Sequence, residues 1–256
     1  MKKIIFALAM SALISTGLIA SSARTSDHSA PAAAIAQVLE AHNAWEADAL
    51  SSFNAEAVRL TFYNDSRVSK LPDFFERKIS VSSNGNAFRR IKSDPMGLTI
   101  QLDLFDGQTA YQAAIEKGST VTDAHQVSDS QFEGVRFSIR TFGLVPILKQ
   151  LSDPATEVVY LGASARRQDK FEVKTAAGRY ILYTDHQHLI RKVEIGDKTI
   201  LFADYRSVEG IQLPFIEKFF IGENTVYEIF FTHIDLNPEF PEDYFTREAL
   251  SKDVTR

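Results

Sequence analysis

The stretch from Leu98 to Ile115, LTIQLDLFDGQTAYQAAI, contains the pattern that decides the fold. Every second residue from Leu98 to Leu104 is apolar and alternates with a polar one. This period of two is typical of a strand with one apolar face and one wet face. Asp106-Gly107 then marks a turn into a second run, residues 109–115. The stretch therefore predicts two neighbouring antiparallel strands.

The same period recurs on both sides of this hairpin. Further strands are predicted near residues 55–62, 75–81 and 87–92, and again between residues 157 and 235, with short turns between them. The result is a mainly β fold with some α, built on a single large curved antiparallel sheet. Such a sheet can close into a barrel, pack on another sheet, or wrap around helices.

Two stretches have helical spacing instead. Residues 32–50 form one apolar stripe, and residues 131–151 form another that Gly143 and Pro146 divide into two short helices. We expect these helices to cover the concave face of the sheet or its mouth. No change of composition marks a linker, so residues 32–256 are predicted to be one domain.

The N-terminus has the layout of a cleavable secretory signal over residues 1–23. Lys2 and Lys3 are followed by an uncharged, mostly apolar run and by small residues that end at Ala23, the expected cleavage site. The alternative is an uncleaved anchor, but the run is short for a bilayer, which needs about 20 apolar residues. Residues 24–31 are predicted to be a flexible leader, and after cleavage no stable membrane insertion is expected.

The composition excludes several classes of function. With 33 acidic and 28 basic residues the net charge is −5, and no basic cluster in the sequence indicates a nucleic-acid partner. The chain has no cysteine, so it has no disulfide, thiolate nucleophile or lipobox anchor. The exported form is therefore expected to diffuse freely, as a monomer.

No motif in the chain indicates catalysis or a cofactor. There is no Gly-x-Ser-x-Gly elbow and no phosphate-binding glycine loop. His186 and His188 lack a third ligand, so they are interpreted as solvated turn residues and no metal site is predicted. Asp103 and the pairs Arg89-Arg90 and Arg166-Arg167 are likewise interpreted as solvated. His42 is expected to be packed or at the edge of a lid.

Phenylalanine is abundant, with 19 in the chain, and it is concentrated in the C-terminal quarter. Phe215 and Phe219 are predicted to share one face of a strand. Such residues are most simply core, and the sharper hypothesis is that some line a cavity for an acyl chain.

Several motifs resemble those of the periplasmic outer-membrane lipoprotein-sorting carriers, the LolA-like superfamily. The resemblance spans about residues 35–245, and the motifs that carry it are FDGQTA at 105–110, FGLVP at 142–146, VYLG at 159–162, LYTD at 182–185, HLIRKVE at 188–194, DYRSVEGIQLP at 204–214 and IDLN at 234–237. It implies an unclosed half-barrel with helices plugging its concave face, and binding of a lipid or lipidated polypeptide there. The carriers' lid arginine lies in a strand with a proline that residues 86–90 lack, so neither Arg89 nor Arg90 is assigned to that role.

The first hypothesis is thus a non-enzymatic periplasmic carrier of a hydrophobic ligand, either a lipid or the acyl chain of a lipoprotein. The alternative is an envelope sensor or protein-interaction module with a filled core, and an enzyme is the least favoured class. The residues predicted to line the hydrophobic cavity are Trp45, Val58, Leu60, Phe62, Leu102, Leu104, Phe142, Leu144, Ile147, Leu148, Phe215 and Phe219.

Overall fold

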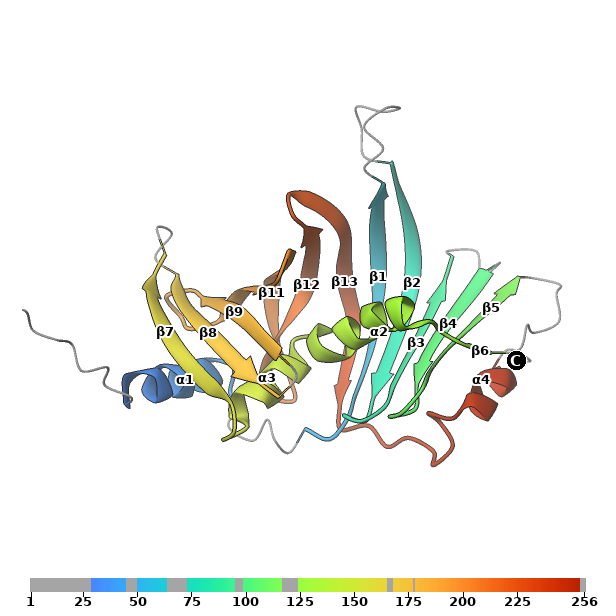
Figure 1. Ribbon diagram of the computed structural model, residues 1–256, viewed down its shortest axis with the longest axis horizontal. Helices are drawn as coiled ribbons and strands as arrows, with labels where there is room; N and C mark the ends of the chain where they lie inside the picture. The colour runs from blue at the N-terminus through green and yellow to red at the C-terminus, as the bar shows by residue number, and fades with distance from the viewer. Residues whose placement is uncertain are drawn as a thin grey trace, which may run out of the picture.

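The hairpin at residues 99–116 lies within one continuous sheet of thirteen strands (Figure 1). The computed structural model describes residues 29–44, 50–63, 73–94, 99–116, 124–164, 168–176 and 178–253. The predicted signal, residues 1–23, most of the predicted leader, and Trp45 lie outside these ranges. None of the helices within them is long and apolar enough to span a bilayer.

The strands and helices follow in this order: α1 (Ser29–Ala41), β1 (Phe53–Tyr63), β2 (Asp73–Ser83), β3 (Phe88–Ser93), β4 (Thr99–Phe105), β5 (Ala110–Glu116), β6 (His125–Gln126), α2 (Asp129–Thr141), α3 (Val145–Ser152), β7 (Glu157–Ala163), β8 (Asp169–Thr175), β9 (Gly178–Thr184), β10 (Ile190–Ile195), β11 (Lys198–Val208), β12 (Ile211–Ile221), β13 (Asn224–Leu236) and α4 (Arg247–Asp253). The prediction of a mainly β fold with one large antiparallel sheet is confirmed. Helix α1 begins at Ser29, inside the segment predicted to be a flexible leader.

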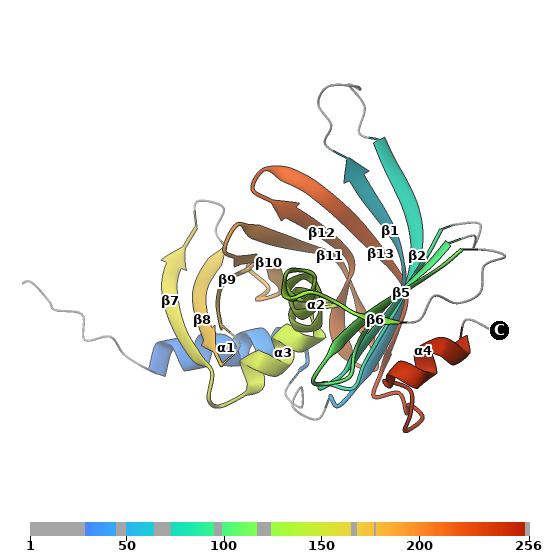
Figure 2. The same ribbon diagram turned by 45° about the vertical axis from the view of Figure 1, so that its right-hand side comes forward.

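The topology consists of two meanders that meet in the middle of the sheet. The strand order is β6-β5-β4-β3-β2-β1-β13-β12-β11-β10-β9-β8-β7, and all the pairs are antiparallel. Strands β6 and β7 are consecutive in the chain but form the two opposite edges. The chain between them therefore crosses the concave side of the sheet, and it does so as α2 and α3 (Figure 2). The sheet is not closed, so it is an unclosed half-barrel.

The turn between β4 and β5 has the chemistry that its sequence predicts. Asp106 Oδ1 accepts hydrogen bonds from the backbone N–H groups of Gln108 (2.8 Å) and Thr109 (2.7 Å). Gly107 has a φ of 100°, a conformation that glycine adopts without steric cost. The side chain and the glycine together reverse the chain, so the two strands pair in register from Thr99 to Glu116.

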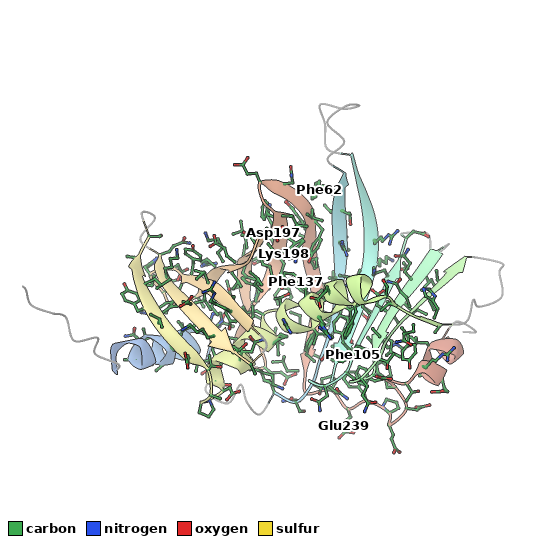
Figure 3. The ribbon with its side chains drawn as sticks, in the orientation of Figure 1. Phe62, Phe105, Phe137, Asp197, Lys198 and Glu239 are labelled. Carbon is green, nitrogen blue, oxygen red and sulfur yellow. The ribbon has the colours of Figure 1, made fainter. Side chains whose placement is uncertain are left out.

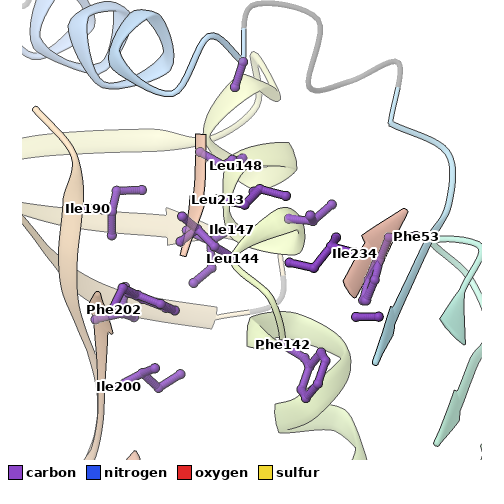
Figure 4. Packing of buried hydrophobic residues seen from close by; sticks show 14 of the residues in the cluster. Phe53, Phe142, Leu144, Ile147, Leu148, Ile190, Ile200, Phe202, Leu213 and Ile234 are labelled. Atoms are coloured by element: carbon purple, nitrogen blue, oxygen red, sulfur yellow. The ribbon is translucent and has the colours of Figure 1, made fainter. Parts of the chain in front are cut away.

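The main hydrophobic core lies between the concave face and the helices. Helix α2 meets the sheet through two ring pairs, Phe137 with Phe219 and Phe132 with Phe105, each with centroids 5.2 Å apart (Figure 3). Helix α3 and the turn before it are buried more deeply, with Leu144, Ile147 and Leu148 at most 1 % exposed (Figure 4). The prediction that helices cover the concave face is confirmed.

A second, smaller cluster covers the opposite face of β3–β5. Leu102 and Leu104 pack there against Phe245 and Leu250, which belong to the C-terminal segment and helix α4. The sequence does not predict this helix, because seven residues with little apolar periodicity give no helical signal above that of a loop. The sheet is consequently covered by helices on both faces, not on its concave face alone.

Replacement of Leu148 by Ala should lower the free energy of unfolding by about 2–5 kcal/mol, because the fully buried side chain leaves a cavity in the main core. Leu161, which is 47 % exposed, provides a matched control, and Leu161→Ala should change stability by less than about 0.5 kcal/mol. Urea unfolding of the two variants and the parent measures both effects. Equal losses in the two variants would contradict the placement of α3 in the core.

Candidate functional site: the covered concave face

The junction between α2 and α3 is fixed to the sheet by a buried carboxyl group. Leu144 has a φ of 65° and Gly143 a φ of 73°, so the chain turns sharply between the two helices. The Gly143 N–H donates to Oε1 of Glu217 on β12 at 2.8 Å. Glu217 is 3 % exposed, and burial raises its pKa to about 8, although the bond from Gly143 opposes the shift. The carboxyl group is therefore mostly neutral at pH 7.

An apolar cleft of about 250 Å³ opens beside this junction. Its apolar lining comes from Leu50 before β1 and Phe53 at its start, from Ile139 of α2, and from Val145 and Pro146 of α3. The polar side chains of the lining are Ser51, Ser52, Ser83, Arg140, Lys149 and Gln150. The cleft thus lies between the helical layer, the start of β1 and the end of β2. A flexible acyl chain could contact carbon there on several sides.

The structure divides the predicted cavity residues between two faces. Phe142, Leu144, Ile147, Leu148, Phe215 and Phe219 all lie in the main core under the helices, at most 8 % exposed. They pack against one another and the sheet, and the cleft is lined by their neighbours. Trp45 lies outside the described residues, and ligand binding by this set stays a prediction.

The remaining five, Val58, Leu60, Phe62, Leu102 and Leu104, point away from α2 and α3. Leu102 and Leu104 pack on the C-terminal segment. Val58, Leu60 and Phe62 alternate along β1 with Ala55 and Ala57, which belong to the main core. The alternation predicted correctly which residues share a face. It could not tell which face is concave, and the apolar face of β4 is the convex one.

The concave face of β3 and β4 also carries a polar network, centred on Asp103. Both Nε and Nη2 of Arg90 lie 2.7 Å from Asp103 Oδ2, with Lys92 Nζ at 3.0 Å, and Gln112 donates to Oδ1 at 2.8 Å. Asp103 is fully buried, which by itself raises a carboxyl pKa, but Arg90, Lys92 and the hydrogen bonds hold its pKa well below the usual range. Arg90 Nη1 also donates to Ser138 of α2 at 2.9 Å, which ties the helix to the sheet.

The prediction that Asp103, Arg89 and Arg90 are solvated is therefore wrong. Asp103 and Arg90 meet because β3 and β4 place them directly opposite each other in the ladder. Arg89 faces the other way, is 2 % exposed, and donates to the carbonyl of Tyr244 at 3.2 Å. Neighbouring arginines on a strand point to opposite faces, and both faces of this strand are covered.

The histidines divide between structural and surface positions. His42 is fully buried at the end of α1, where Nδ1 lies 2.8 Å from the Gln212 carbonyl and Nε2 accepts from the Ile190 N–H at 3.1 Å. Burial lowers its pKa to about 4, so it is a neutral, packed histidine, as expected. His186 is exposed at the turn after β9. The described ranges contain no group of three or more residues able to hold a metal ion.

The chain has a LolA-like fold: an unclosed antiparallel half-barrel with helices on its concave face. Neither the protein-family models nor the curated proteins compared with it match its sequence. A solved LolA superfamily protein from Nitrosomonas europaea has a TM-score of 0.52 and 16% identity, over 84% of this chain and 98% of that one. A DUF1329 family protein from Desulfovibrio piger has a TM-score of 0.53 and 12% identity, over 86% and 98%. At these identities the likeness concerns the fold.

Glu217 predicts a specific dependence of stability on pH. Its folded pKa is raised above the ordinary value of 4.5, so its contribution is complete at low pH and is lost as pH rises towards 8. Glu217→Gln keeps an acceptor for Gly143 and removes the titration. The stability of the variant minus that of the parent should rise by about 1.4 kcal/mol per pH unit between roughly pH 5 and 8.

Urea unfolding at several pH values measures this difference, in which the contribution of His42 cancels because both proteins contain it. Glu223→Gln, at an exposed turn, serves as the control and should leave the pH profile unchanged. A pH-independent difference for Glu217→Gln would show that the carboxyl group is already ionised in the fold.

Proposed function

We propose that this protein is an exported, non-enzymatic carrier that binds an acyl chain of a lipid or lipidated protein. In this proposal residues 1–23 are removed near Ala23, and residues 32–256 act in the periplasm as one monomeric unit. The LolA-like fold supports the proposal, and the apolar cleft beside α2 and α3 is the single observation that carries it. Each methylene buried there would contribute about 0.8 kcal/mol.

The size of the cleft indicates how a longer ligand would enter. Its volume, about 250 Å³, is somewhat below the roughly 300–1,000 Å³ of small-molecule pockets. Helix α2 is less deeply buried than α3: Val135 lies in the core, but Phe132 and Phe137 are half-buried, and the bond from Arg90 to Ser138 ties the helix to the sheet. We expect α2 to shift when a long chain binds, while α3 stays in the core.

A neutral fluorescent probe, N-phenyl-1-naphthylamine, tests the proposal. The mature protein should enhance its fluorescence, and added fatty acid should displace it. Gln150→Trp places a large ring at the lining of the cleft and should weaken binding about fivefold, which corresponds to about 1 kcal/mol. Gln187→Trp, at an exposed turn away from the cleft, should bind as the parent does. Absence of any enhancement with the parent protein would rule out the carrier function.

A protein-interaction module is the second candidate, and strand β7 favours it. This strand is an edge of the sheet, and Val159, Tyr160 and Leu161 are 41–47 % exposed on it. Exposed apolar residues on an open edge are typical of a surface that receives another chain. If this is the function, an envelope protein should bind in stoichiometric amount and be lost with Leu161→Lys. Equal capture by the variant and the parent would count against this surface.

A further inference from the structure

Strands β1–β4 carry an excess of positive charge on their concave face. The described side chains that alternate onto this face include four cations, Arg59, Arg77, Arg90 and Lys92, and a single carboxylate, Asp103. Asp94 follows directly after β3 at the same end. In a chain with a net charge of −5, this is a local reversal of sign. Arg90 bonds to Ser138 of α2, and all four cations are partly buried, so water screens them less than it screens surface charge.

Arg59 and Arg77 are the unusual pair within this group. They are direct partners in the ladder between β1 and β2, a position where like charges destabilise a sheet. Arg77 donates to Gln101 Oε1 at 2.6 Å. Arg59 Nε is buried without a hydrogen-bond partner, and no carboxylate among the described residues forms an ion pair with Arg59. A buried donor without an acceptor costs about 1–3 kcal/mol, and more when it is charged.

The nearby carboxylate does not compensate this charge. Both oxygens of Asp103 are already contacted, Oδ2 by Arg90 and Lys92 and Oδ1 by Gln112. Burial and the positive charge of Arg90 lower the pKa of Lys92 to about 8, even with Asp103 beside it. Burial also lowers the pKa of Arg59, and the charges of Arg90 and Arg77 act in the same direction. Among the side chains that the structure describes here, Arg59 Nε is thus a buried donor left without an acceptor.

We propose that Arg59 and Arg77, supported by Arg90 and Lys92, form a binding site for an anionic oxygen group, a carboxylate or a phosphate. A guanidinium presents parallel N–H donors that match the oxygens of both groups. The site lies roughly 20 Å along β1 from Phe53 in the cleft, since each strand residue advances about 3.3 Å. It is therefore separate from the cleft that carries the proposed function.

The surroundings of Arg59 favour an anion that is attached to an apolar body. The guanidinium carbon lies 4.2 Å from the centre of the Tyr227 ring, and Tyr227 stacks on Phe219 at 4.7 Å. Phe219 in turn meets Phe137 of α2 (Figure 3). A row of rings thus leads from the charged group to the helical cover. An acyl chain could lie along these rings with its head group at the arginines, and a free anion would use the arginines alone.

The first measurement is thermal unfolding of the mature protein in sodium phosphate and in sodium chloride at matched ionic strength. Phosphate should raise the melting temperature by about 5 °C or more at saturation, because it binds only the folded state. Arg59→Gln should abolish the rise. Arg179→Gln, an arginine that is 71 % exposed and paired with Glu172, should keep it.

The second measurement compares laurate with 1-dodecanol, which has an equal chain without charge, by displacement of the neutral probe. Laurate should bind the parent about tenfold more tightly, and this ratio should fall to about one in Arg59→Gln. A preference for laurate without a phosphate effect assigns the site to the head of an amphiphile, and the reverse assigns it to a free anion. The parent protein alone provides both comparisons, so they do not depend on the folding of a variant.

Two results would contradict the proposed anion site. One is the absence of both the phosphate effect and the laurate preference in the parent. The other is equal behaviour of Arg59→Gln and Arg179→Gln. Binding of 1-dodecanol with neither anion effect would leave the carrier function intact and remove this site. Phosphate stabilisation of a protein that binds no hydrophobic probe would support the anion site and contradict the carrier function.

Discussion

The connection between β6 and β7 is the constraint on which the rest of the structure depends. These strands are consecutive in the chain but form opposite edges of the sheet, so residues 127–156 must cross its concave side. A curved sheet in water has to cover an apolar concave face, and the crossing segment supplies that cover. The two meanders join in the middle of the sheet, where β1 pairs with β13. Strands β6 and β7 therefore lie at opposite edges, and the chain between them has to cross the sheet.

The fold buries several polar groups, and each of them is compensated in a different way. Glu217 receives the Gly143 N–H and stays mostly neutral, so no uncompensated charge is buried at the junction. Asp103 remains charged because Arg90 and Lys92 contact it, and Arg90 extends the network to α2 through Ser138. His42 is neutral and bonds the backbone on both sides of its ring. Arg59 is the group without such a solution, and for that reason it carries the inference of an anion site.

The two helices of the cover therefore differ in what they can do. Helix α3 contributes Ile147 and Leu148 to the deepest part of the core and can leave it only at a cost of several kcal/mol. Helix α2 places Val135 in the core and is further held by two ring pairs and by the bond from Arg90 to Ser138, with the cleft at its C-terminal end. A ligand that used either site would contact α2, so this helix is where binding would couple to a change of shape.

Local patterns determined the class of fold by themselves. Alternation at 98–104 and the Asp106-Gly107 turn made the hairpin predictable, and Gly143 and Pro146 marked the break between α2 and α3. Those features depend on backbone preferences and on spacing along the chain, which a sequence displays directly. Only the tertiary structure decided which face of each strand is concave. Leu102 and Asp103 alternate whichever side is inside, and the choice depends on where α2 and α4, remote in the sequence, pack. The proposed anion site also depends on the tertiary structure. The pairing of β1 with β2 brings Arg59 to Arg77, and the pairing of β3 with β4 brings Arg90 to Asp103.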